Sequence, residues 1–467
     1  MKWIAVLGAI ALSACSGPSE DEATYDRYLE RIIAANNLRP LPTKPYEETP
    51  KFKLGQALFF DPILSGNRDI SCATCHLVGA GLSDGLPASI GSGGVGLGTS
   101  RERPRDRPAQ PRNSLDLWNR DNNSVKSMFW DGRAEVLDPV NRKFRTPLGD
   151  LLPEGFENLM AVQAIFPLTQ ADEMLGLPGD ASPGGNPPAH AGLVNEIAAS
   201  VVDLEEPYRT AAVLDHVVSR LIGTPDTPPS HWELEYRRLF EKAFPGTSPE
   251  EVSIVHVGNA LAHFEEIAFA TRDTPWDRYL EGDMTAIGLE AKRGAFLFFG
   301  RGRCAVCHGG PLFSDFEFHS IGARPFGAGY DGQGHDTGRF RVTRRPADKF
   351  KFRTPPLRNV TLTAPYFHNG SAKTLDEAIR QHADPLQYAD KYAESGEPLL
   401  QIDEIDSVSP ILLIRVELAR REIDYLVAFL MALEDDGIDR LEGVVPLGVP
   451  SQLPIHSTSG AGDIRGH

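Results

Sequence analysis

The chain has 467 residues, of which 41% are hydrophobic and 24% charged, a composition typical of a globular protein with two or three domains. Its net charge of -17 argues against nucleic acid as a partner, because binding phosphates requires a basic surface. The same charge is compatible with a cationic protein partner.

The N-terminal residues have the features of a secretory signal peptide. Lys2 precedes the apolar run Trp3–Leu12, and small residues follow before Cys15. Leu-Ser-Ala-Cys15 resembles a bacterial lipobox, in which the cysteine becomes the lipidated first residue of the mature protein; the alternative is a plain signal peptide with an incidental cysteine. We expect residues 1–15 to be a lipoprotein signal peptide. The mature chain should then lie in the periplasm, attached to the membrane only through a lipid on Cys15.

A leader segment, residues 16–50, is expected ahead of the first domain. Tyr25–Asn36 places apolar residues on one side of a helix, and the proline-rich residues 38–49 predict an extended linker. The helical segment Leu54–Phe60 then opens the first domain.

Two cysteines three residues apart, followed at once by a histidine, occur twice and account for four of the five cysteines. The two motifs are Cys72-Ala-Thr-Cys75-His76 and Cys304-Ala-Val-Cys307-His308. This spacing is typical of c-type haem attachment, in which each thiol adds to a haem vinyl group and the histidine becomes an axial ligand of the iron. A four-cysteine zinc site is the alternative, but it leaves both histidines without a role. We therefore expect two covalent haems.

The rest of the chain predicts helices and long loops, and no strong strand pattern is present. Helices are expected over Glu250–Thr271, Ile287–Phe299 and Ile411–Leu433. Loop-like segments are Gly79–Arg112, Leu137–Phe156 and Gly176–Ala191. The expected fold is mainly α, with two cytochrome c-like haem domains facing each other and long loops. The expected limits are 51–283 for the N-terminal haem domain, 284–436 for the C-terminal haem domain and 437–467 for a flexible tail.

In motif order and spacing, the chain resembles the bacterial dihaem cytochrome c peroxidase family, which includes the MauG-like enzymes. The resemblance extends over residues 54–433. The segments that carry it are Leu54–Phe60, Cys72–His76, Phe129–Arg133, Gln163–Met174, Cys304–Asp315 and Leu357–Gly370. It implies that the N-terminal haem meets peroxide and that the C-terminal haem transfers electrons.

The resemblance also assigns roles around the first haem. Glu173 matches the acid–base residue that takes a proton from peroxide and returns it to the leaving oxygen, and Gln163 would hydrogen-bond the peroxide or a pocket water. Many peroxidases of this family close the iron with a histidine from the loop after the attachment motif. This chain has no histidine between His76 and His190, so the first iron is expected to be open at rest.

Other matched residues lie between the predicted domains. Trp130 corresponds to the tryptophan between the two haems and would relay electrons, although an ordinary core tryptophan is the alternative. Asn113, Thr363 and Pro365 match positions that hold a calcium ion, which suits one amide and two carbonyl oxygens. The sequence therefore predicts one calcium site.

The distal ligand of the second haem is the main departure from the family pattern. The matching position holds methionine in peroxidases and tyrosine in MauG-like members, but here it is His382. Thr374 and Glu377 form a capping box, and His382 falls on the apolar face of the helix that follows. We therefore expect His76, His308 and His382 to be axial ligands of the two irons.

Two enzymatic functions follow from the resemblance. The first is reduction of hydrogen peroxide to water with electrons from a small cytochrome c or a cupredoxin. The second is a MauG-like reaction in which peroxide oxidises side chains of a partner protein through a high-valent dihaem state. A pure electron carrier is a third interpretation, which the absence of a distal histidine disfavours. A homodimer is left open.

Overall fold

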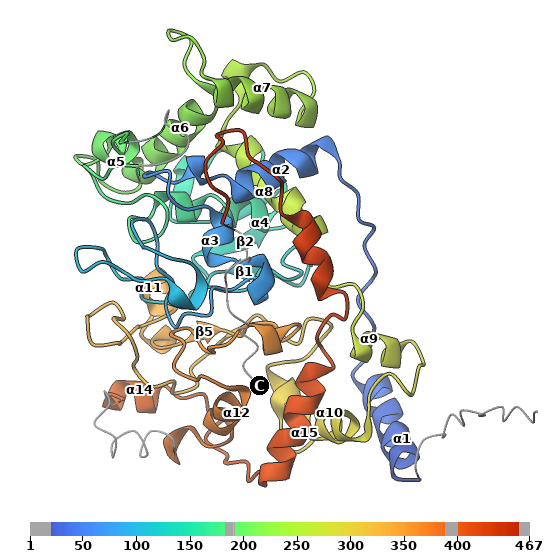
Figure 1. Cartoon of the computed structure of the whole chain (residues 1–467). Coiled ribbons are helices and arrows are strands. Elements are labelled where there is room, and N and C mark those ends of the chain that lie inside the picture. The colour runs from blue at the N-terminus through green and yellow to red at the C-terminus, as the bar shows by residue number, and fades with distance from the viewer. Residues whose placement is uncertain (1–19, 183–189, 191, 388–399, 457–467) are drawn as a thin grey trace, which may run out of the picture.

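The computed structural model describes residues 20–182, 190, 192–387 and 400–456, and it is mainly helical. Cys15 and the expected signal peptide lie outside the described residues. Figure 1 shows two stacked parts: most of the predicted N-terminal domain lies above, and most of the predicted C-terminal domain lies below. The buried apolar residues form two hydrophobic clusters, one for each part, although Leu312 and Phe316 of the predicted C-terminal domain belong to the first cluster. Within the described residues, no helix combines the length and the apolar character needed to cross a bilayer.

The N-terminal domain is built around the contact of two helices, α2 and α8. Its helices are α2 (Pro50–Phe60), α3 (Cys72–Cys75), α4 (Leu159–Gln163), α5 (Glu196–Ser200), α6 (Tyr208–Ile222), α7 (His231–Ala243) and α8 (Ile254–Ala268). Helix α2 begins where the Thr49 side chain accepts a hydrogen bond from the Phe52 backbone N–H. A Cβ on Gly55 would lie 2.0 Å from the Ala260 carbonyl oxygen, so only glycine lets α2 and α8 approach this closely.

The C-terminal domain repeats this arrangement with α10 and α15. Its helices are α9 (Pro275–Leu280), α10 (Leu289–Phe299), α11 (Phe340–Thr343), α12 (Leu375–Ala383), α14 (Ile402–Asp406) and α15 (Arg420–Met431). A Cβ on Gly294 would lie 1.8 Å from the Tyr425 carbonyl oxygen. The doubled unit is therefore a helix that leads into the attachment motif and is crossed, at a glycine, by the last helix of its domain.

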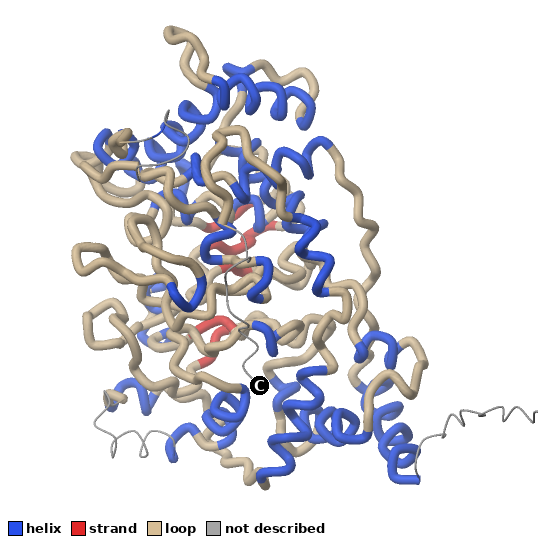
Figure 2. The backbone as a smooth tube through the Cα atoms, in the orientation of Figure 1, coloured by secondary structure: helices blue, strands red, loops and turns tan. Residues whose placement is uncertain are grey.

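Short strands lie between the helices, as the red segments of Figure 2 show. Strands β1 (Ser127–Met128), β2 (Ala134–Asp138) and β3 (Lys143–Arg145) form an antiparallel sheet in the order β1-β2-β3, and β4 (Phe318–His319) pairs with β5 (Phe352–Arg353). The expectation that Leu137–Phe156 is only loop is wrong, since β3 and the end of β2 lie within it. The expected helix Ile411–Leu433 begins only at Arg420.

The leader helix belongs to the C-terminal domain. Helix α1 (Glu20–Ala35) packs on α10, and the ammonium of Lys292, whose side chain is 1% exposed, lies 2.9 Å from the Asp26 carboxylate. Helix α9 falls within the predicted N-terminal limits, yet its Trp276 packs against Phe429 of α15 at 5.0 Å between ring centroids. The second core therefore includes segments that precede and segments that follow most of the N-terminal domain in the sequence.

The expected flexible tail is wrong for residues 438–456. Ile438–Val444 forms a 3-10 helix, and Leu441 is buried in the core of the N-terminal domain. The Ser451 hydroxyl donates a hydrogen bond to the buried Asp61 carboxylate, and His456 Nδ1 lies 2.7 Å from Thr74 Oγ1. The content of proline, glycine and serine predicts flexibility, but the apolar residues of this segment, Leu441, Val444, Val449 and Leu453, are buried in the N-terminal core. Residues 457–467 lie outside the described residues.

Candidate functional site

The first attachment motif forms a single helical turn. Helix α3 ends at Cys75, and the His76 backbone N–H donates to the Cys72 carbonyl at 3.0 Å, so both thiols and the imidazole border one cavity. His76 Nδ1 donates to the Leu82 carbonyl at 3.2 Å, which leaves Nε2 with a lone pair. Burial lowers the pKa of His76, so its imidazole is neutral. A neutral imidazole whose Nδ1–H is held by a carbonyl is oriented as a metal ligand.

The first cavity has a volume of about 710 Å³. Cys72, Cys75, His76, Trp130, Gln163 and Glu173 line it together with Arg133 and Phe129. His76 is the one histidine among the described residues that line this cavity, and Met128 and Met174 also reach it. His190, the next histidine in the chain, is buried elsewhere against Trp232.

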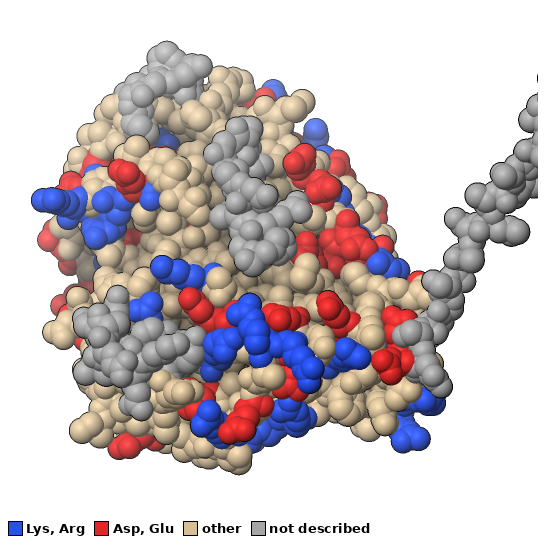
Figure 3. Space-filling view, turned by 60° about the horizontal axis from the view of Figure 1, so that its bottom comes forward, with Lys and Arg blue, Asp and Glu red and all other residues tan. Residues whose placement is uncertain are grey.

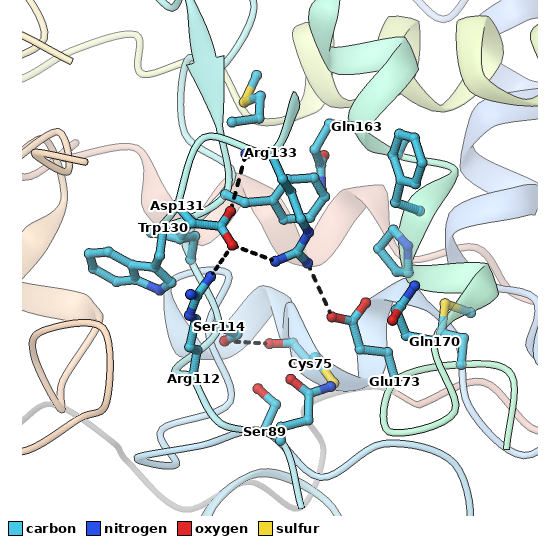
Figure 4. Close-up of a pocket in the computed structure, with 18 of the residues that line it drawn as sticks. Cys75, Ser89, Arg112, Ser114, Trp130, Asp131, Arg133, Gln163, Gln170 and Glu173 are labelled. Carbon is cyan, nitrogen blue, oxygen red and sulfur yellow. Dashed lines mark hydrogen bonds and ion pairs between the residues drawn. The ribbon is translucent and has the colours of Figure 1, made fainter. Parts of the chain in front are cut away.

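Glu173 and Arg133 face each other in this cavity (Figure 4). Arg133 Nη2 lies 3.7 Å from Glu173 Oε1, and the guanidinium lies over the Phe129 ring at 3.8 Å from its centroid. Burial raises the pKa of Glu173 to about 7, although the charge of Arg133 acts in the opposite direction. A carboxyl with a pKa near neutrality can both accept and return a proton.

The residues between Trp130 and Gln163 include the β2–β3 hairpin. Arg145, at the end of β3, lines the first cavity, and helix α4 follows with Gln163 at its end. Gln163 and Glu173 therefore reach the same cavity despite the long insertion between Trp130 and Gln163.

The second attachment motif makes the same turn. Cys304–Val306 is a 3-10 helix, and the His308 backbone N–H donates to the Cys304 carbonyl at 2.8 Å. His308 Nδ1 donates to the Phe313 carbonyl at 3.0 Å, so Nε2 is again free. Burial, reinforced by the neighbouring His382, lowers the pKa of His308 to about 4.

His382 lies opposite His308 across a second cavity of about 230 Å³. It projects from α12, whose first turn is capped by Thr374, and its Nδ1 donates to the Ala378 carbonyl at 2.8 Å. The two imidazole centroids are 6.2 Å apart. A metal held by two imidazole nitrogens at about 2 Å each separates the ring centres by roughly 6 Å.

These features test whether the chain fits two covalent haems, and it does. Each cavity has two free thiols and a neutral histidine whose Nδ1–H is fixed by a carbonyl. A four-cysteine zinc site does not fit, because the two cysteine pairs line different cavities. One group of close ligand atoms, Cys307, Asp315 and His319, occurs among the described residues. A hydrogen bond to Asp315 raises the pKa of His319 to about 10, so this imidazole is charged and a poor metal ligand.

Trp130 borders both cavities. It is 9% exposed, and its Nε1–H donates to the Asn113 carbonyl at 2.9 Å. The indole is therefore fixed in the wall that separates the two sites.

The three residues matched to a calcium site all line the second cavity. The Asn113 side-chain amide lies 3.4 Å from the Pro365 carbonyl oxygen and 2.7 Å from the Leu86 carbonyl oxygen. The Thr363 hydroxyl donates to the Val360 carbonyl, which leaves the Thr363 carbonyl as the group available to a cation. The Asn113 amide nitrogen thus donates to two of the nearby carbonyls, and the calcium site stays a prediction.

Sequence reasoning gave no role to the arginines of this region. Arg112 is buried between Asp131 and Asp336, with ion-pair distances of 2.7 and 2.6 Å, and it joins the two domains. Arg133 ends a motif that was recognised, but nothing local showed that it would face Glu173. These partners are far apart in the sequence, so only the folded chain reveals them.

The chain has two c-type attachment turns, and each lies beside a cavity lined by a neutral histidine that is oriented to bind iron. These features define a dihaem protein. A model of the di-haem cytochrome c peroxidase family matches residues 49–285, and the chain belongs to this family. It is accordingly a dihaem peroxidase, an oxidoreductase that uses peroxide as acceptor.

Known proteins resemble the chain over nearly its whole length. The methylamine utilization protein MauG of Methylorubrum extorquens is 31% identical over 443 residues, which cover 92% of this chain and 93% of that protein. The cytochrome c551 peroxidase of Pseudomonas aeruginosa is 29% identical and covers 80% of this chain and 83% of that protein. A crystal structure of a MauG-like protein associated with microbial copper homeostasis matches with a TM-score of 0.56 and 26% identity, covering 86% of this chain and 94% of that one.

Proposed function

We propose that the protein reduces hydrogen peroxide to water in the first cavity, with electrons that enter through the second. The observation that carries this proposal is that Glu173 and Arg133 face each other in the first cavity. Among the described residues, His76 is the one histidine that lines this cavity. When bound there, haem supplies the redox chemistry of O–O cleavage. The reaction takes up two electrons and two protons for each peroxide and yields two water molecules.

The side chains of the first cavity bind peroxide and transfer its proton. Glu173 accepts a proton from the oxygen of peroxide that binds the site and returns it to the oxygen that leaves. Arg133 keeps a positive charge beside Glu173 and limits the rise of its pKa. Gln163 orients peroxide or a water molecule by hydrogen bonding. Because His76 is the one histidine that lines this cavity among the described residues, peroxide would enter without a histidine ligand first having to leave.

The second cavity serves electron transfer. His308 and His382 would both hold the second iron, which would leave no position for a substrate. Trp130, in the wall shared by both cavities, relays electrons or holes between the sites. Asn113, Thr363 and Pro365 would hold one calcium ion near the same wall.

A MauG-like oxidation of a partner protein is the second candidate function. The observation that favours it is His382, because a second imidazole lowers the reduction potential relative to methionine. Such an enzyme reacts with peroxide from the diferric state and draws its two electrons from side chains of a partner instead of a redox carrier.

The second attachment motif lies beside an exposed surface suited to a redox partner. Val306 and Ile414 are 59% and 62% exposed. Exposed arginines lie within a few residues of them in the sequence: Arg301, Arg415, Arg420 and Arg421. Figure 3 shows Lys and Arg side chains gathered on the lower face, with Asp and Glu among them. An apolar centre with a basic rim fits a small cytochrome c or cupredoxin with an acidic contact face, whereas the net charge alone suggested a basic one.

The location of the protein follows from its first residues. We propose that the mature chain is held at a periplasmic membrane surface by a lipid on Cys15. Mass spectrometry of the membrane fraction tests this, and a mature chain that starts elsewhere would exclude the anchor.

The experiment that tests the proposed function compares peroxide turnover with and without an electron donor. The purified holoprotein is given peroxide together with either a reduced acidic cytochrome c or no donor. Steady turnover that depends on the cytochrome supports peroxide reduction. One equivalent of peroxide consumed without donor, followed by oxidation of a co-expressed partner protein, supports the MauG-like function instead. Absence of any peroxide consumption excludes both.

A further inference from the structure

Two buried arginines present unpartnered nitrogens at the wall of the first cavity. Arg120 is 5% exposed and Arg353 is 1% exposed, and both line this cavity. In the described part of the chain, the Nη1 atoms of both side chains have no hydrogen-bond partner. A buried guanidinium that lacks a partner is costly, so such a nitrogen indicates a missing acceptor.

The protein supplies too little negative charge for this pair. Asp116 is paired with Arg120, whose Nη2 donates to its carboxylate at 2.8 Å and whose Nε donates to its carbonyl at 2.9 Å. Arg353 reaches only a neutral acceptor, the Phe129 carbonyl, at 3.1 Å from its Nε. Burial and the charge of Arg120 lower the pKa of Arg353 to about 9, so it remains charged at neutral pH.

Glu265 is the other carboxyl that lines this cavity near Arg120, and it does not fill the gap. It is 5% exposed, and its Oε2 has no hydrogen-bond partner among the described residues. Burial raises its pKa to about 8, so the group is mostly neutral at pH 7. Two guanidinium charges therefore face one paired carboxylate, and the missing acceptor must be an anion from outside the chain.

Arg353 occupies a position that Arg120 does not share. It lies on β5, and its backbone N–H donates to the Trp130 carbonyl at 2.8 Å. Arg353 lines the second cavity as well as the first, whereas Arg120 lines only the first. One charged side chain thus lies in the wall between the two sites.

We infer that Arg120 and Arg353 form a carboxylate-binding site for the propionate groups of the two haems, with Arg353 acting on both. This inference rests on the proposed presence of two haems. A guanidinium binds carboxylate in a bidentate fashion, which explains why arginine stands at both positions. A nearby positive charge stabilises the reduced form of an iron site. Arg353 therefore raises the reduction potentials of both haems, and Arg120 raises that of the first haem.

The test measures haem content and the two reduction potentials in holoprotein variants. Arg353→Gln and Arg120→Gln remove the charges, Arg353→Lys keeps one, and Arg238→Gln serves as control because that arginine is 65% exposed on α7 and lines neither cavity. Haem is counted by the pyridine haemochrome method, and potentials come from a spectroelectrochemical titration that follows each haem separately.

We expect Arg353→Gln to lower both potentials, each by at least about tenfold in the reduction equilibrium, which is about 59 mV for one electron. Arg120→Gln should lower only the first potential, and Arg353→Lys should give smaller shifts in the same direction. Potentials equal to those of the control would overturn the inference, and a shift at one haem alone in Arg353→Gln would overturn the shared site.

Two further outcomes are also decisive. If Arg353→Gln retains fewer than two haems, Arg353→Lys and Arg120→Gln decide the matter, and unchanged potentials in both overturn the inference. If the variants show these shifts but the wild-type protein, with its two haems, consumes no peroxide, the carboxylate site is supported and the proposed function fails. A wild-type protein that carries no haem would overturn both the inference and the proposed function.

Discussion

The imidazoles of His308 and His382 face each other across the second cavity with their ring centroids 6.2 Å apart and their planes inclined by 67°. Both Nδ1 atoms donate to carbonyl oxygens of their own segments, so both Nε2 atoms are free to bind one metal. This relationship links two residues that are 74 positions apart in the sequence (308 and 382). It supports the proposal that the second site is closed to substrates and transfers electrons.

Replacing His382 tests this arrangement. His382→Met should raise the reduction potential of the second haem, because a thioether stabilises the ferric state less than a second imidazole does. His382→Ala should abolish the low-spin bis-histidine signal in the EPR spectrum. If signal and potential are both unchanged in His382→Ala, another side chain holds the iron.

Removing the acid–base group tests the first cavity. Glu173→Gln should retain both haems and slow peroxide cleavage by about 10²- to 10⁴-fold, since the amide cannot accept or return the proton. Stopped-flow absorption after addition of peroxide measures the rate. Glu157→Gln is a matched control, because that carboxylate pairs with Lys51 at the surface. Equal rates in Glu173→Gln and the wild type would remove Glu173 from the mechanism.

The raised pKa of Glu173 predicts a pH profile. The base form is present only above the pKa, so the rate constant for peroxide cleavage should rise with pH and reach half of its maximum near pH 7. Arg133 lowers this pKa, so Arg133→Gln should move the midpoint to higher pH. A profile that is flat between pH 5 and about 8, or a midpoint that moves to lower pH in Arg133→Gln, would contradict this assignment.

The tryptophan between the cavities should control communication between the haems. Trp130→Phe keeps an aromatic ring but removes the readily oxidised indole and the hydrogen bond to Asn113. We expect electron transfer from the reduced second haem to the first to slow by about tenfold or more, which is about 1.4 kcal/mol of activation free energy. Rapid mixing of half-reduced protein with peroxide measures it, with Trp232→Phe, at a tryptophan that lines neither cavity, as control.

The packed C-terminal segment should contribute to stability. Leu441→Ala removes a side chain that is 1% exposed in the N-terminal core, and such truncations cost about 2–5 kcal/mol in the free energy of unfolding. Leu447→Ala, at a fully exposed leucine a few residues later, should have no effect. Thermal unfolding followed by circular dichroism measures both. Equal melting temperatures for Leu441→Ala and the wild type would mean that this segment does not pack on the N-terminal core in solution.

The parts of the site that sequence predicts are those carried by short motifs. The two attachment turns and the capped helix that presents His382 depend on residues within one or two turns of each other. Their spacing alone determines which side chains share a face. Apolar periodicity likewise predicts α8 and α10.

The parts that sequence misses depend on contacts between distant segments. The backbone N–H of Arg353 on β5 donates to the Trp130 carbonyl. The buried Leu441 packs in a core whose other residues mostly come from much earlier in the sequence. Helix α1 gives an ordinary amphipathic pattern, but nothing in that pattern shows that Asp26 will pair with Lys292, which lies 266 residues further along the chain. Burial of a charge, and hence a shifted pKa, is likewise a property of the assembled fold.

The most direct test of an open first site is the EPR spectrum of the as-isolated diferric protein before and after one equivalent of peroxide, with no reductant present. The structure predicts a high-spin ferric signal from the first haem beside a low-spin signal from the second, and loss of the high-spin signal at once on addition of peroxide. An entirely low-spin resting spectrum that reacts with peroxide only after a reductant is added would contradict the account, because a side chain such as Met174 would then close the first iron.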